Sequence, residues 1–121
     1  MNFKLKGLIV ENESWKGQVK QLEDENIQFK NQLVGILKTG VANVSMDHLE
    51  SFQNRFIKMD EQIILLRHEL REQFHLLQDE GTSYRKAMEQ QKRLEVKMII
   101  VQENFDKLRV SFHDYLRQVY L

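Results

Sequence analysis

Large apolar and aromatic residues recur at alternating spacings of three and four over the last third of the chain. The series is Tyr84, Ala87, Gln91, Leu94, Met98, Val101, Phe105, Leu108, Phe112, Tyr115 and Val119. A spacing that averages 3.5 residues places these side chains in one narrow seam along an α-helix, the pattern by which helices wrap around one another. The pattern therefore predicts a helix over residues 84–120 whose seam packs against other helices.

Two earlier segments carry the same repeat. Residues 46–80 contain Leu49, Phe52, Phe56, Met59, Ile63, Leu66, Leu70 and Leu77, with Gln73 as the polar interruption. Residues 12–38 contain Trp15, Val19, Leu22, Asn26, Phe29, Leu33 and Ile36. We predict a helix over each segment, the first with Asn12 as its N-cap. Asn26 has two interpretations: it fixes the register by pairing with a partner amide, or it lies at the edge of the apolar stripe.

Residues 1–11 have no single periodicity. Phe3 and Leu5 alternate with lysines as in a strand, whereas Leu5 and Leu8 also fit the helical repeat that follows. We expect these residues to form a flexible arm, either a short strand or a frayed helix start.

A clear break follows at residues 38–45. Gly40 suits the position just after a helix, and Ser45 is a good N-cap for the next one. Val44 and Leu49 have the spacing of a hydrophobic staple, which fixes the angle at which a chain enters a helix. We predict a loop between the first two helices.

A second break is predicted at residues 79–83, Asp-Glu-Gly-Thr-Ser. A turn there makes the flanking helices equal in length and brings the apolar runs 63–66 and 98–101 to the same height. The predicted fold is then all-α, a single domain of three long antiparallel helices in a coiled-coil-like bundle. Because the repeat stays in phase across Gly81, the alternative is a short helix plus one continuous long helix that pairs between chains.

Composition agrees with long helices and narrows the chemistry. The 121 residues include no proline, no cysteine and only five glycines, so helix-breaking positions are few. The absence of cysteine excludes disulfides and thiolate chemistry and fits a reducing compartment. No apolar run approaches the roughly 20 residues of a membrane helix. We expect a soluble cytoplasmic protein with no membrane partner.

Charge is balanced overall but uneven along the chain. Lysine plus arginine and aspartate plus glutamate are each 18. Residues 41–81 have four basic and eight acidic side chains, and residues 82–121 have eight and five, so the second helix should lie favourably beside the third. A basic stripe on the third helix could contact phosphates, but glutamates interrupt it, and we expect no nucleic-acid partner. Its members are Arg85, Lys86, Lys92, Arg93 and Lys97.

No motif for catalysis or for nucleotide binding is present, so we expect a non-enzymatic protein without a cofactor. His68, Glu72 and His75 are the candidate metal ligands, because Glu72 and His75 have the Glu-x-x-His spacing of di-iron bundles. Such ligands must face the bundle interior, whereas the seam at Leu70 and Leu77 turns these three toward solvent. We therefore predict no metal site.

Apolar residues outside the seam are the best indication of function. Ile64, Leu65, Ile99 and Ile100 lie where the seam is richest, and a three-helix core cannot cover all four. We predict that they form an interface, in a homodimer or with another protein. The predicted function is a helical interaction module, a scaffold or adaptor. A ligand- or metal-binding bundle is the alternative, and phosphate or nucleic-acid binding through the third helix is a further one.

Overall fold

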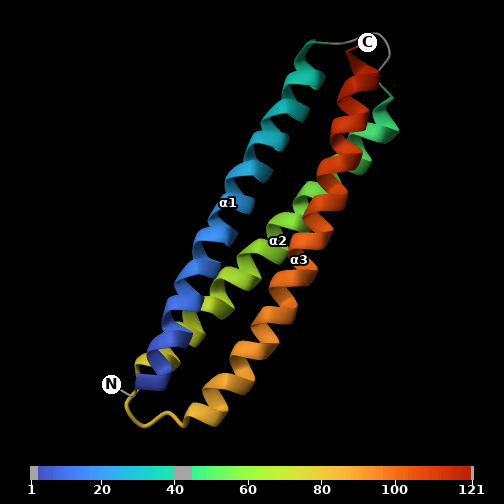
Figure 1. Ribbon diagram of the computed structural model, residues 1–121. Coiled ribbons are helices and arrows are strands. Elements are labelled where there is room, and N and C mark those ends of the chain that lie inside the picture. The colour runs from blue at the N-terminus through green and yellow to red at the C-terminus, as the bar shows by residue number, and fades with distance from the viewer. Residues whose placement is uncertain (1–2, 40–44, 121) are drawn as a thin grey trace.

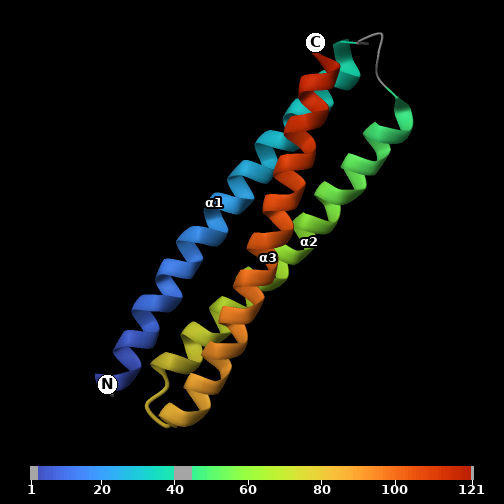
Figure 2. The ribbon, with the colours of Figure 1, turned by 45° about the vertical axis from the view of Figure 1, so that its right-hand side comes forward.

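Three long helices packed side by side form the molecule. The computed structural model describes residues 3–39 and 45–120, which contain α1 (Phe3–Thr39), α2 (Met46–Gln78) and α3 (Tyr84–Val119). Helices α1 and α3 run in one direction and α2 runs in the other (Figures 1 and 2). At 1.5 Å per residue each helix is about 50 Å long. The predicted all-α, three-helix antiparallel bundle is confirmed.

The core of the bundle is the predicted heptad seam. Nearly every seam residue of the three helices is buried, from Trp15 in α1 to Val119 in α3. Aromatic rings from all three helices meet in the half of the bundle that holds the C-terminal end of α1. The ring of Phe112 lies 5.3 Å from that of Phe29 and 5.0 Å from that of Phe56, and Phe29 stacks on Phe105 at 5.9 Å. Such pairs contribute about 0.5–1.5 kcal/mol each beyond the burial of their area.

The prediction of a flexible arm over residues 1–11 is wrong for the residues described. Helix α1 begins at Phe3, and Leu5 and Leu8 are buried in a small cluster with Leu77 and Ala87. This cluster extends the core to the end where α2 turns into α3, so the helical interpretation of the Leu5 to Leu8 spacing holds. Residues 1–2 lie outside the described residues.

Asn12 is not an N-cap. It lies inside α1 and is fully buried, and its side-chain nitrogen donates a hydrogen bond to the main-chain oxygen of Leu70, 3.1 Å away. Asparagine is a common cap because its side chain can bond to main-chain groups, and here it uses the same ability toward a neighbouring helix.

Asn26 is also fully buried, so it is not at the edge of the stripe. Its side-chain nitrogen donates to Asp60 Oδ1 at 2.7 Å and to the main-chain oxygen of Phe56 at 3.3 Å. Its partners are therefore a carboxylate and a main-chain carbonyl of α2, not the amide that the sequence suggested. Lys30 Nζ lies 2.6 Å from Asp60 Oδ2, so the carboxylate joins both residues of α1.

Gln73 and Gln91 form a polar layer across the three helices. Gln73 Nε2 donates to Gln91 Oε1 and to the main-chain oxygen of Ala87, each at 3.0 Å. Gln91 Nε2 in turn donates to the main-chain oxygen of Leu8 at 3.0 Å and to Glu11 Oε1 at 3.1 Å. Both glutamines are buried, and their bonds tie α1, α2 and α3 together at one height.

The turn between α2 and α3 is confirmed, and the continuous helix is wrong for this chain. Helix α2 ends at Gln78, two residues before the predicted end, within the usual uncertainty of helix boundaries. Asp79 Oδ1 accepts a bond from the amide of Gly81 at 3.0 Å, and the Thr82 hydroxyl donates to the Leu76 oxygen at 2.8 Å. Ser83 then caps α3, with its side chain accepting from the amide of Lys86.

The other break lies partly outside the described residues, which include neither Gly40 nor Val44. Ser45 is the N-cap of α2 with extended backbone angles, as predicted, but its side chain makes no capping bond. The amide of Leu49 bonds instead to the main-chain oxygen of Ser45 at 3.2 Å. Within residues 3–39 and 45–120, none of the helices combines the length and the apolar character needed to cross a membrane.

Replacing Asn26 with alanine should lower the free energy of unfolding by about 1–3 kcal/mol, because the substitution leaves the carbonyl of Phe56 and the carboxylate of Asp60 with fewer donors. Asn31 lies exposed on the same helix, and its replacement with alanine should change stability by less than about 0.5 kcal/mol. Urea unfolding followed by far-UV circular dichroism measures both. Equal losses in the two variants would contradict the role of Asn26.

Replacing Leu5 with alanine should cost about 2–5 kcal/mol, the range for truncating a buried leucine. The same change at the exposed Val10 should be nearly neutral. Thermal unfolding of the two variants compares them directly. If Leu5→Ala leaves the melting temperature unchanged, the start of α1 does not pack on the bundle.

Candidate interaction surfaces

The candidate metal ligands face solvent, as the seam predicts. His68 Nε2 lies 2.9 Å from Glu72 Oε1, and both side chains are largely exposed. This contact is an ion pair only when the imidazole is protonated. His75 is exposed one turn further along, with its ring beside that of Phe74. In the part of the chain that the structure describes, no group of three or more potential ligands is arranged to hold a metal ion.

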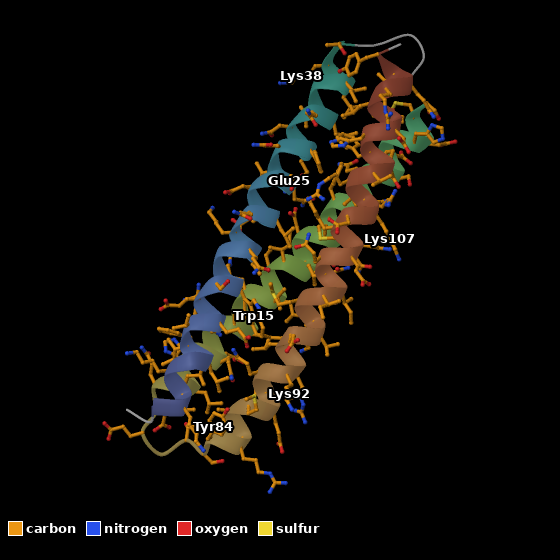
Figure 3. All side chains as sticks on the ribbon, viewed as in Figure 1. Trp15, Glu25, Lys38, Tyr84, Lys92 and Lys107 are labelled. Atoms are coloured by element: carbon orange, nitrogen blue, oxygen red, sulfur yellow. The ribbon has the colours of Figure 1, made fainter. Side chains whose placement is uncertain are left out.

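The basic stripe of α3 is engaged in part by carboxylates. Arg85 lies 3.5 Å from Glu89 within α3, and Lys97 Nζ lies 2.6 Å from Glu69 Oε2 across α2. The second contact is the pairing of an acidic α2 with a basic α3 that the charge pattern predicts. Figure 3 shows where Lys92, another member of the stripe, lies along α3.

The four apolar residues outside the seam are all exposed. The exposed fractions are 56% for Ile64, 58% for Leu65, 50% for Ile99 and 49% for Ile100. The inner core therefore covers none of them fully, whereas the sequence predicts only that it cannot cover all four. Two of them, Leu65 and Ile100, line a common hollow that neither Ile64 nor Ile99 lines.

Leu65 and Ile100 form the walls of a hollow that we name the α2–α3 groove. Leu66 and Val101 lie below them as its buried floor, and the hollow has a volume of about 290 Å³. Two polar bridges between α2 and α3 bound it. At one end is the ion pair between Glu69 and Lys97, and at the other Asn104 Nδ2 donates to Gln62 Oε1 at 3.3 Å.

Ile64 lies on a different side of α2, toward α1. The residues four before it and three after it, Asp60 and Arg67, both reach α1, where they pair with Lys30 and Glu23 at 2.6 Å each. Side chains at these spacings share one face of a helix. Midway between Lys30 and Glu23 is Ile27, which therefore stands at the height of Ile64.

Ile27 and Ile64 belong to a longer apolar surface that we name the α1–α2 strip. Its five residues have exposed fractions between 42% and 56%: Ile27, Val34, Leu37, Ile57 and Ile64. Val34, Leu37 and Ile57 also line a hollow of about 160 Å³ between the two helices. The interface predicted from sequence includes only Ile64 of this strip. The spacing of seven residues from Ile27 to Val34 and from Ile57 to Ile64 is the signal that would have revealed it.

Most charges beside the α1–α2 strip are paired within the described chain. The pairs of Lys30 with Asp60 and of Arg67 with Glu23 cross between the helices. Lys20 lies 3.0 Å from Asp24 Oδ1, and the hydrogen bond to this carboxylate raises the pKa of Lys20 above its usual value. Glu61 and Lys38, which are exposed at the edges of the strip, have no ion-pair partner among the described residues.

A further ion pair joins α1 to α3. Arg109 makes two hydrogen bonds to the Glu25 carboxylate, at 2.7 and 2.8 Å, and a third to Asp106 at 2.7 Å. The hydrogen bond to Glu25 raises the pKa of Arg109 above its ordinary value, so this guanidinium is charged throughout the range in which proteins fold. Figure 3 shows Glu25 on α1 near α3.

Comparison of the chain with protein-family models, with curated proteins and with solved structures finds no match. Its function is therefore proposed below from the two apolar surfaces.

Removal of metal ions by a chelator should leave the melting temperature unchanged, because His68, Glu72 and His75 do not enclose a site. Added stoichiometric zinc or iron should likewise have no effect. Differential scanning calorimetry with and without metal measures this. A shift of several degrees that disappears in a His68→Ala variant would show that these residues bind the ion.

Proposed function

We propose that this protein is a non-enzymatic helical interaction module, a scaffold or adaptor that contacts helices of other proteins or of a second copy. The α1–α2 strip is the observation that carries the proposal. Large exposed apolar patches are rare on monomeric proteins and often mark interaction sites. The strip is an apolar surface of this kind that is crossed by the ion pairs Lys30–Asp60 and Glu23–Arg67. Heptad spacing along α1 and α2 also makes the strip a seam of the kind that receives another helix. The absence of cysteine supports a reducing compartment, and we propose the cytoplasm.

A second copy of the chain is the occupant we propose for the α1–α2 strip. Most charges beside the strip are paired within each copy, which limits repulsion between two copies, although Glu61 of one copy would lie close to Asp60 of the other. A two-fold axis that crosses α2 midway between Ile57 and Ile64 would place Ile57 of one copy against Ile64 of the second copy, and the reverse. Such a self-complementary contact closes the assembly at a dimer.

Binding of a metal or another ligand receives less support. The histidines of α2 are exposed, and the hollows of the α2–α3 groove and of the α1–α2 strip are open depressions between helices. A ligand-binding bundle builds its site from side chains of facing helices, in the position that Phe29, Phe56 and Phe112 fill here.

Sedimentation at high micromolar concentration should show the wild-type protein as a dimer. Replacing Ile57 and Ile64 together with lysine should give a monomer, because two charges would enter an apolar contact. Its helical circular dichroism should be unchanged, since both side chains lie outside the core.

The matched control replaces Val96 and Val110 with lysine, which adds the same charge at two exposed apolar positions of α3. This variant should remain a dimer. A wild-type protein that sediments as a monomer, or a control that dissociates equally, would contradict self-association through the α1–α2 strip.

A further inference from the structure

We propose that the α2–α3 groove is a docking site for an amphipathic helix that carries carboxylates, contributed by a partner other than a second copy. This inference extends the proposed function to a named surface and a partner of stated chemistry. It stands apart from self-association, which uses the α1–α2 strip on the other side of α2.

The groove is long enough to hold a helix. Beyond the bridge between Gln62 and Asn104, it continues as a second hollow of about 150 Å³ whose floor includes Met59 and Leu108. From Glu69 at one end to Arg55 at the other, α2 spans about 21 Å at 1.5 Å per residue. A helix of about 14 residues covers this distance.

The middle of the groove offers apolar contact. Leu65 and Ile100 are each about half exposed, although they stand beside the buried Leu66 and Val101. A helix that placed apolar side chains three, four and seven residues apart along the groove would cover both, in the manner of helices that bind in grooves. Full burial of such a side chain contributes to binding because its apolar area leaves water.

One end of the groove is basic. Arg55 and Lys58 of α2 line the second hollow, and Lys107 of α3 lines an adjoining one together with Arg55. Within residues 3–39 and 45–120, none of these three side chains has a carboxylate in ion-pair range. Figure 3 shows Lys107 on the outer side of α3. Asp106 lies nearby, but its carboxylate is bonded to Arg109.

The opposite end differs, because there Lys97 is already paired with Glu69. The basic side chains without a carboxylate partner among the described residues thus lie at the end that holds Arg55, Lys58 and Lys107, where the Arg55 guanidinium lies over the ring of Phe52. Carboxylates on a bound helix would complement that end, and complementary charge selects partners and increases the rate of association.

A second copy fits this groove poorly. In a two-fold dimer centred on Ile100 with antiparallel α3 helices, Lys107 of one copy would face Arg93 of the other, since both lie seven residues from the centre. If the two-fold axis runs parallel to the groove instead, α3 of each copy lies over α2 of the other. Lys107 of one copy would then lie near Lys58 of the other. Either arrangement brings like charges together, which disfavours the contact.

Two designed peptides test the proposal. Each is an amphipathic helix of about 18 residues with the same leucine face, and the flanking positions are glutamate in one and lysine in the other. Fluorescence anisotropy of the labelled peptides titrated with the full-length protein gives both affinities. The acidic peptide should bind about ten-fold or more tightly than the basic one, and added salt should reduce the difference.

Protein variants locate the site. Replacing Leu65 and Ile100 with glutamine should weaken binding of the acidic peptide by about ten-fold or more, because central apolar contacts dominate such interfaces. The matched change at Ile57 and Ile64 should leave peptide binding intact. Replacing Lys58 and Lys107 with glutamine should reduce the preference for the acidic peptide.

The proposal is overturned if neither peptide binds, if both bind equally, or if the Leu65 and Ile100 variant binds as the wild type does. Each of these outcomes leaves the sedimentation result at Ile57 and Ile64 unaffected, so the failure of this proposal is distinguishable from the failure of the proposed function.

Discussion

Buried amide side chains hold the three helices at one relative height, and the surface of the bundle depends on this register. An apolar heptad seam packs almost equally well after a shift of seven residues, so it does not select one height by itself. The bonds of Asn12 to Leu70, of Asn26 to Phe56, and of Gln91 to Leu8 join side chains to main-chain carbonyls of other helices. A shift would leave these polar groups buried without partners, at a cost of about 1–3 kcal/mol each.

This register determines which exposed residues become neighbours. Pairing of Asp60 with Lys30 and of Arg67 with Glu23 brings Ile27 beside Ile64. On the other side of α2, the bridges from Glu69 to Lys97 and from Gln62 to Asn104 bring Leu65 level with Ile100. A different register would separate both pairs. The buried polar residues that fix the register therefore also determine which apolar residues are neighbours on the surface.

The amides specify the register at some expense of stability. The side-chain oxygens of Asn12, Asn26 and Gln73 are buried and accept no hydrogen bond within the described chain. Each amide thus donates to its partner helix while half of its bonding capacity is unused. An apolar residue at these positions would avoid that cost, but it would also remove the preference for one height. The same compromise is seen where a single polar residue fixes the register of a coiled coil.

The sequence predicts the fold because the heptad repeat depends only on local spacing. It also predicts the solvent-facing side of His68, which depends on one helix alone, and the turn at residues 79–83, which follows from the matching lengths and apolar runs of the two flanking helices. It does not predict the structural role of Asn12, because the same side chain serves as a cap or as a buried donor to another helix. Nor does spacing decide whether Leu5 packs, since its partners Leu77 and Ala87 lie far away in the chain.

The two apolar surfaces escape sequence analysis for a related reason. Ile64 and Leu65 form one apolar run in the sequence, and only the positions of α1 and α3 show that they face different neighbours. In α1, Ile27 and Val34 flank the seam without forming a run, so they are easily taken for its edge. A helix inside a three-helix bundle has two neighbours, and the repeat of one helix does not indicate which side faces which.

Separation of the two surfaces has a consequence for a scaffold. The α1–α2 strip has most of its nearby charges paired within the chain, which suits contact with an identical surface. At one end the α2–α3 groove has three basic side chains that lack ion-pair partners among the described residues, which suits an acidic helix. Because the surfaces flank α2 on different sides, occupation of one leaves the other accessible. A dimer formed through the strip would therefore present two grooves, and the effective concentration of paired sites would increase the affinity for a partner that carries two acidic helices.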